Sequence, residues 1–225
     1  MHSCPFEVSD TVFENNSAEV GAAASVILAG EYVFDNVHIV DNKGVYNGGV
    51  WVERTDSFEM KDSVIENNHI DPTGTTMPTG SYGVFFVEDA EAVLKDTIIQ
   101  ENTHVSSKLT PYEPTGVFVS RKGDLLWEGS TSGASALIDN ERHGMYVSTL
   151  DGWFESDNVD FGTVKNGDDN VGGDVGVTCS ECSSPGKFYY LGDSVDVLCD
   201  GEYCSSDLKV SDNDPTNDLF ECGVG

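Results

Sequence analysis

Positively charged residues are scarce in this chain of 225 residues, which has 11 Lys and Arg against 40 Asp and Glu and a formal net charge of -29. Proteins that bind nucleic acid neutralise its phosphates with Lys and Arg, and an anionic membrane surface repels an acidic protein. The composition therefore argues against both as partners. Divalent cations, basic partners and a saline habitat are all compatible with it.

Long apolar runs are also missing. A membrane-spanning helix needs roughly 20 apolar residues, and residues 22–30 (AAASVILAG) are too few for one. The first ten residues, MHSCPFEVSD, lack the basic flank and apolar segment of a signal peptide. Because the chain begins within a repeat and stops without an obvious cap, we expect a fragment of a longer extracellular or cell-surface protein, with no membrane insertion by this segment.

An apolar residue followed three positions later by Asn recurs along the chain. The first three of these asparagines are 26 residues apart, and insertions lengthen the later gaps to 34 and 38. We expect the asparagines to form a structural ladder in which each side-chain amide hydrogen-bonds to the next, as in other stacked strands. The pairs are Phe13/Asn16, Ile39/Asn42, Ile65/Asn68, Ile99/Asn102 and Leu137/Asn140.

A second phrase combines Gly with alternating β-branched and aromatic residues, which is typical of a strand. It occurs at residues 48–52, 83–87, 116–119 and 144–147. Weaker strand patterns lie at residues 57–61, 92–95 and 124–129. Three short strands in each repeat, without helical periodicity, predict an all-β fold: a single-stranded right-handed parallel β-helix of about six coils over residues 1–178.

Aromatic residues recur within the second phrase, and Trp51, Phe85, Phe118 and Tyr146 are expected at equivalent positions of successive coils. If the alternating Val and Met side chains point inward, these aromatics form an outward stripe. Exposed aromatic stripes hold sugar rings in many proteins, so the four residues are candidate ligand-binding residues. Two alternatives remain: a long loop covers the stripe, or the register is reversed and the aromatics belong to the core.

The repeats resemble a known family. FENN at 13–16, GAAAS at 21–25 and NGGVWV at 47–52 are similar to the FxxN and GGA-type repeats of polymorphic outer-membrane proteins. More widely, residues 6–178 resemble the right-handed parallel β-helix, or pectate-lyase-like, superfamily. The resemblance implies a secreted or surface-displayed passenger with an adhesive or structural role. It implies no particular activity, because the superfamily contains both enzymes and non-enzymes.

The favoured function is therefore a non-catalytic one, in which the chain is adhesive, structural or glycan-contacting and binds an extracellular polysaccharide or a surface protein. The alternative is a polysaccharide lyase or glycoside hydrolase acting on an extracellular polysaccharide. Paired carboxylates can cut a glycosidic bond, but the complete motifs of such enzymes are missing, so whether the chain is an enzyme stays open. The candidate catalytic residues are Asp139, Glu141, Arg142 and His143.

No cofactor is required by the favoured function, although two acidic segments offer oxygen ligands for calcium. Asp168 and Asp169 lie in residues 166–176, and Asp212 and Asp214 lie in residues 211–218. Neither segment has the spacing of a complete calcium-binding loop. Solvated acidic turns are the alternative interpretation.

Cysteine is concentrated at the carboxyl end, where residues 179–225 are expected to form a small β cap or the start of a following module. We expect disulfides, as in other surface proteins, and a zinc ribbon is the alternative. Cys4 lies at the opposite end, on the order of 30 Å away at one strand spacing per coil, a distance that no disulfide spans. It is therefore expected to be free, paired with sequence upstream, or reached by a returning tail. The other cysteines are Cys179, Cys182, Cys199, Cys204 and Cys222.

Overall fold

The secondary structure of the protein is entirely β within the residues that the computed structural model describes. None of these residues lies in a helix, so none belongs to a helix that is long and apolar enough to cross a membrane. The all-β prediction is confirmed for them. The described residues are 6–73, 82–105, 114–120, 122–130, 133–138, 140, 143–147, 153–157, 159, 197–199, 202–204, 208–211 and 219–222.

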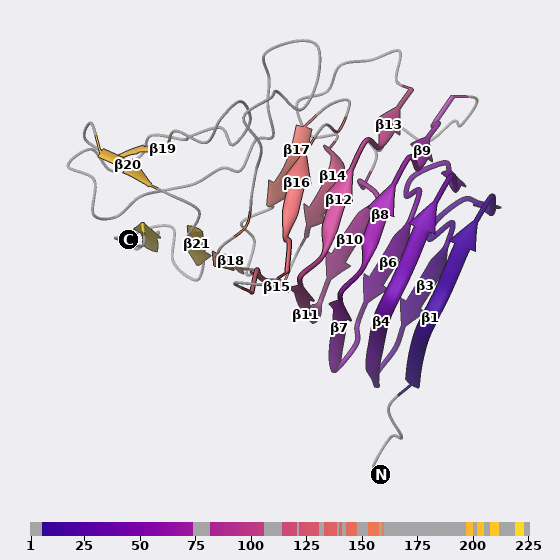
Figure 1. Ribbon diagram of the computed structural model, residues 1–225, viewed down its shortest axis with the longest axis horizontal. Helices are drawn as coiled ribbons and strands as arrows, with labels where there is room; N and C mark the ends of the chain where they lie inside the picture. The colour runs from indigo at the N-terminus through magenta and orange to yellow at the C-terminus, as the bar shows by residue number, and fades with distance from the viewer. Residues whose placement is uncertain are drawn as a thin grey trace.

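Three sheets contain most of the described strands, and Figure 1 shows β1, β4 and β8 in a layer in front of β3, β6 and β10. The largest sheet contains β1 (Phe6–Glu14), β4 (Glu31–Val40), β7 (Ser57–Lys61), β8 (Val64–Glu66), β11 (Ala90–Lys95), β12 (Ile98–Gln100), β15 (Gly123–Glu128), β16 (Ala136–Ile138), β18 (Trp153–Asp157), β21 (Leu208–Ser211) and β22 (Leu219–Cys222). The second contains β3 (Ala24–Ile27), β6 (Val50–Glu53), β10 (Phe85–Glu88), β14 (Pro114–Val119) and β17 (His143–Val147). The third contains β2 (Ser17–Ala18), β5 (Lys43–Gly44), β9 (His69–Ile70) and β13 (Thr103–His104).

Strands β1 to β18 pair in parallel, and each pairs with the equivalent strand of a neighbouring repeat. Phe13 lies opposite Ile39, which lies opposite Ile65 in turn. The same register continues to Ile99 and Leu137. The apolar residues of the repeat therefore lie above one another at one sheet position, as the spacing of 26 residues predicts.

The repeated asparagines form a continuous amide ladder at the end of these strands. The side-chain oxygen of Asn68 accepts hydrogen bonds from the backbone nitrogen of Asn42 at 3.0 Å and from its Nδ2 at 3.0 Å. Nδ2 of Asn68 donates to the carbonyl oxygen of Ile39 and to Oδ1 of Asn102. Asn16 and Asn140 extend the ladder at its two ends, with Nδ2 to Oδ1 distances of 2.9 Å each. Buried polar groups of the turn are satisfied in this way.

Each repeat turns at three residues with left-handed backbone geometry. In the described part of the chain, twelve non-glycine residues have positive φ, and all of them fall into three rows of equivalent positions. Eight of the twelve are Asn or Asp, the residues that adopt this conformation most readily. An Asp or Asn precedes each of the first four ladder asparagines by six positions and belongs to one of these rows, which gives its recurrence a physical reason. The rows are Asp10, Asn36, Asp62 and Asp96; Asn15, Asp41, Asn67 and Glu101; and Leu28, Arg54, Asp89 and Lys122.

Glycine in the second phrase permits close contact between successive repeats. A Cβ atom on Gly49 would lie 2.4 Å from the carbonyl oxygen of Val84. On Gly83, whose φ is +70°, it would lie 2.6 Å from the carbonyl oxygen of Gly116. Neither distance is compatible with a side chain, so glycine is required where backbone passes over backbone.

An apolar core lies between the sheets and continues from repeat to repeat. Phe34 packs against Phe58 with ring centroids 5.2 Å apart, and Phe58 packs against Phe85 at 5.8 Å. Val50, Val52, Val117 and Val119 on the second sheet are fully buried in the same cluster. Because one repeat has no interior of its own, each stack of side chains depends on the repeats on both sides.

The carboxyl-terminal strands pair differently, since β21 is antiparallel to both β18 and β22. β19 (Val197–Cys199) and β20 (Glu202–Cys204) form a separate antiparallel pair. β-structure is therefore present between residues 197 and 222, in the segment expected to form a cap. The expected domain boundary at residues 178 and 179 lies outside the described residues, as do Cys4, Cys179, Cys182 and the side chains of Cys199, Cys204 and Cys222.

We predict that Asn68→Ala lowers the free energy of unfolding by about 2–4 kcal/mol, because it removes the acceptor of the buried backbone nitrogen of Asn42 and a donor to the carbonyl oxygen of Ile39. Urea denaturation followed by circular dichroism measures this loss. Asn16→Ala is the matched control at the exposed end of the ladder and should cost less than about 1 kcal/mol. Equal losses for the two variants would show that the buried ladder has no special role.

Candidate functional site: an external aromatic cluster

The outward row of aromatics on the second sheet differs by one residue from the sequence prediction. Trp51 lies opposite Phe86, and Phe86 lies opposite Phe118, which pairs with Tyr146. Phe85 instead lies opposite Val50 and Val117 and is fully buried in the core. The prediction that Phe85 lies at the position equivalent to Trp51 and Phe118 was therefore wrong. Two adjacent phenylalanines point to opposite faces of a strand, and the sequence pattern alone did not show which of them continues the row.

Four rings from the described residues gather on the outer side of this sheet. The rings of Trp51 and Phe86 stack with centroids 3.9 Å apart. Tyr82 packs edge-on against Trp51 at 5.3 Å and against Phe86 at 5.1 Å. It also stacks on Phe118 at 5.7 Å, with an interplanar angle of 15°. Tyr82 thus joins the rings of three successive repeats. Trp51, Tyr82, Phe86 and Phe118 are called the external aromatic cluster below.

Burial within the external aromatic cluster is uneven. Phe86 is fully buried, whereas Trp51, Tyr82 and Phe118 are half-buried. Tyr46 adds a further ring at 6.3 Å from Tyr82 and is itself buried. Solvent therefore reaches the margins of the cluster but not its centre. Tyr82 lies against the row of rings, and the insertion that precedes it, at residues 74–81, lies outside the described residues, so the alternative in which a long loop covers the stripe stays a prediction.

A carboxylate fixes the orientation of Trp51. The indole Nε1 donates a hydrogen bond of 2.9 Å to Oε2 of Glu53, and the guanidinium of Arg54 contacts Oε1 of the same carboxylate. Burial acts to raise the pKa of Glu53, but the hydrogen bonds from Trp51 and Arg54 and the charge of Arg54 outweigh it and lower that pKa below its ordinary value. Glu53 is therefore an ionised acceptor at neutral pH.

This arrangement combines apolar ring surface with polar groups at its edge. The half-buried aromatic rings can offer their remaining exposed surface to the C–H groups of a sugar, and the adjacent carboxylate and guanidinium can hydrogen-bond to hydroxyl groups. Tyr82 and Tyr46 bring phenol groups to the same region. The cluster has the mixed character of a carbohydrate-contacting surface.

Two residues of this region, Tyr46 and Tyr82, were missed by the sequence analysis. Their backbones pair, since the nitrogen of Tyr82 donates to the carbonyl oxygen of Tyr46 at 2.8 Å. Both lie just before the second phrase: Tyr46 is two residues before Gly48, and Tyr82 is one residue before Gly83. A tyrosine just ahead of this glycine was the available signal, but the insertion before Tyr82 disguised its spacing.

The predicted catalytic and calcium-binding side chains lie outside the part of the chain that the structure describes. Asp139, Glu141 and Arg142 lie outside the described residues, as does the side chain of His143 in β17. Asp168, Asp169, Asp212 and Asp214, the expected calcium ligands, lie outside them too, and so does the side chain of Tyr146. Among the residues that the structure describes, no three His, Cys, Asp or Glu side chains are grouped so that they could hold a metal ion.

A polar network on the largest sheet also links three repeats. Glu66 accepts a hydrogen bond of 2.7 Å from Nε2 of Gln100, and its other oxygen lies 2.8 Å from Nε2 of His38. The bond from Gln100 is the main reason that the pKa of Glu66 lies below its ordinary value. The side chain of His38 is 41% exposed. Because the groups of this network hydrogen-bond to one another, it reinforces the stacking of the three repeats.

No protein-family model, curated protein or solved structure matches the chain. The resemblance of its repeats to polymorphic outer-membrane proteins and to the pectate-lyase-like superfamily therefore stays a prediction.

The lowered pKa of Glu53 predicts a contribution to stability that depends on pH. A carboxyl group with a lower pKa in the folded protein stabilises the fold above its unfolded pKa, near 4.3. This contribution is lost as the pH falls through the lower folded value. We expect Glu53→Gln to lose less stability than the wild type between pH 6 and pH 3 in urea denaturation. An identical loss in the two proteins would contradict the linkage.

Proposed function

We propose that the chain is a right-handed parallel β-helix from a secreted or cell-surface protein, with a non-catalytic adhesive or structural role in which the external aromatic cluster contacts glycan. The in-register parallel sheets and the amide ladder support the β-helix part of this proposal. Three single-residue turns in each repeat also fit a chain that winds around one core and returns to its starting position.

The external aromatic cluster is the observation that carries the glycan part. Trp51, Tyr82 and Phe118 are half-buried and keep part of their apolar surface in contact with solvent, and apolar surface patches commonly mark binding sites. Phe86 and Tyr82 belong to no part of the main core, yet they pack tightly with Trp51 and Phe118. The rigid sheet beneath them holds the rings at fixed spacing, which reduces the entropy lost on binding.

The ligand expected at this cluster is a neutral or basic glycan. Forty acidic residues give the protein a strong negative charge, and a polyanionic polysaccharide would be repelled from it. Glu53 adds a local negative charge at the edge of the cluster, and Arg54 compensates for it. The lyase or hydrolase alternative depends on the side chains of residues 139 and 141–143, so nothing in the described residues favours it.

We predict that the protein binds neutral or amino-sugar glycans on a glycan array and that Trp51→Ala and Phe118→Ala each weaken binding at least about tenfold, since an aromatic contact contributes roughly 0.5–1.5 kcal/mol beyond the area it buries. Binding to the selected glycan is then measured by isothermal titration calorimetry. Val105→Ala, which removes an exposed apolar side chain beside a different sheet, is the matched control and should bind like the wild type.

Turnover is tested in the same samples by assaying for new reducing ends and unsaturated uronates. Release of either product by the wild-type protein would overturn the non-catalytic part of the proposal. Absence of binding to every glycan on the array, with the wild type folded as judged by circular dichroism, would overturn the glycan part. Circular dichroism of the two alanine variants confirms that a weaker signal reflects the missing ring.

A further inference from the structure

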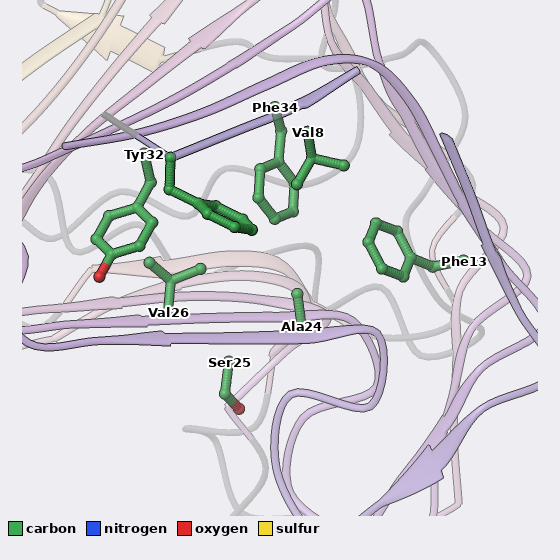
Figure 2. A pocket seen from close by; sticks show the side chains of 8 residues that line it. Val8, Phe13, Ala24, Ser25, Val26, Tyr32 and Phe34 are labelled. Carbon is green, nitrogen blue, oxygen red and sulfur yellow. The ribbon is translucent and has the colours of Figure 1, made fainter. Parts of the chain in front are cut away.

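The outer face of the second sheet carries carboxylates beside its row of rings. Figure 2 shows how side chains alternate along β3, where Ala24 and Val26 point between the sheets and Ser25 points to the opposite side. Ser25 lies opposite Trp51 in the neighbouring strand, so the row of rings lies on this outer side. The residues two positions further along β6 and β10 point the same way as the rings of those strands. They are Glu53 and Glu88.

Glu53 and Glu88 form a second row that runs parallel to the rings. The two residues lie directly opposite one another on neighbouring strands, at one strand spacing of about 4.8 Å. Each follows its ring, Trp51 or Phe86, by two positions, so the carboxylates belong to the same two repeats as these rings. Like charges at directly opposite positions destabilise a pair of strands. A positive group on this face is therefore favoured.

The turn that follows these strands adds further charge. Arg54 and Asp89 occupy equivalent positions in one row of left-handed turn residues, and both are exposed. The hydrogen bond to Glu53 is the main reason that the pKa of Arg54 lies above its ordinary value, and the charges of Glu53, Asp89 and Glu88 raise it further. The guanidinium thus lies among three carboxylates. Lys122 follows Asp89 in the row, so carboxylates outnumber cations by one among these residues.

The rings themselves also favour a positive ligand. The face of a Trp ring attracts an ammonium group that lies within about 6 Å of its centroid. Trp51 is half-buried, and its Nε1 donates to Oε2 of Glu53 at 2.9 Å, so a carboxylate lies at the edge of the indole. A ligand group that touches the exposed surface of Trp51 therefore lies near a negative charge as well. An ammonium group attached to a sugar ring makes both contacts at once.

We propose that the external aromatic cluster binds a polymer of amino sugars, whose rings lie on Trp51 and Phe118 and whose ammonium groups lie beside Glu88 and Asp89. The two parallel rows favour a linear polymer, because a chain of sugars that follows the rings from repeat to repeat also runs along the carboxylates. The net charge of -29 attracts such a polycation from a distance. This inference rests on the glycan contact proposed above and specifies the class of glycan.

Two sugar hexamers with the same backbone and different charge test this inference. Both are β-1,4-linked, and one consists of glucosamine and the other of N-acetylglucosamine. Calorimetry at about pH 5.5, where the amines are protonated and the carboxylates ionised, should show at least about fivefold tighter binding of the glucosamine hexamer. Raising the salt from about 50 to about 500 mM should narrow this difference, because salt screens exposed charges.

Hexalysine is the control for charge without sugar rings. It cannot place a sugar ring on Trp51 and Phe118, so it should bind at least about fivefold more weakly than the glucosamine hexamer.

Two double variants separate the effect of this edge from the general negative charge of the protein. Glu88→Gln combined with Asp89→Asn should reduce the preference for the glucosamine hexamer to less than about twofold. Asp62→Asn combined with Glu101→Gln removes the same charge at exposed turns of the other two rows and should keep the preference of the wild type. Circular dichroism checks that both variants fold.

Several results would overturn the inference. Equal binding of the two hexamers by the wild type, or an equal preference in the two double variants, would show that this edge does not select amino sugars. In the first case, weaker binding of both hexamers by Trp51→Ala would leave the proposed glycan contact standing. Tighter binding of hexalysine than of the glucosamine hexamer would assign the surface to a basic peptide. Absence of binding by both hexamers would also overturn the inference, and the glycan array then decides separately on the glycan contact.

Discussion

Hydrogen bonding between the side chains of successive asparagines is the interaction on which the rest of the structure depends. Each buried amide uses both its oxygen and its nitrogen, accepting from one repeat and donating to the next. Leaving one such group unpaired costs more than a typical hydrogen bond contributes. A one-residue shift between repeats would break these bonds and also move apolar side chains out of the core. The ladder and the core therefore impose the same register.

A fixed register allows the outer parts of the repeat to vary. The ladder asparagines are separated by 26, 34 and 38 residues, yet their hydrogen bonds remain alike. Additional residues enter between strands, and the paired strands stay in place. Tyr82 comes directly after such a lengthened connection and lies over three repeats. The external aromatic cluster thus forms on the outside of the sheets and leaves the register of the ladder unchanged.

Much of the fold could be predicted from local patterns because the same strand and turn residues recur in each repeat. The strand expected at residues 57–61 is β7, and those expected at 92–95 and 124–129 overlap β11 and β15. The candidate site was harder. Trp51 and Phe118 were placed in one row, but Phe85 was confused with Phe86, and Tyr82 was missed. Which residues form a row on a sheet depends on the register of each strand. The adjacent Phe85 and Phe86 both fit the pattern, so the sequence alone left this register uncertain by one residue.

The sequence by itself determined the β-strand content, the spacing of the repeats and the row of asparagines, because these follow from which residue types recur and how far apart they are. Only the tertiary structure decided which of two adjacent phenylalanines points inward, how Tyr82 reaches rings from three repeats, and which carboxylates lie beside the row of rings. The physical reason is that recurrence fixes contacts between equivalent positions. Contacts between different positions depend on how the backbone turns at residues such as Asp62 and Arg54.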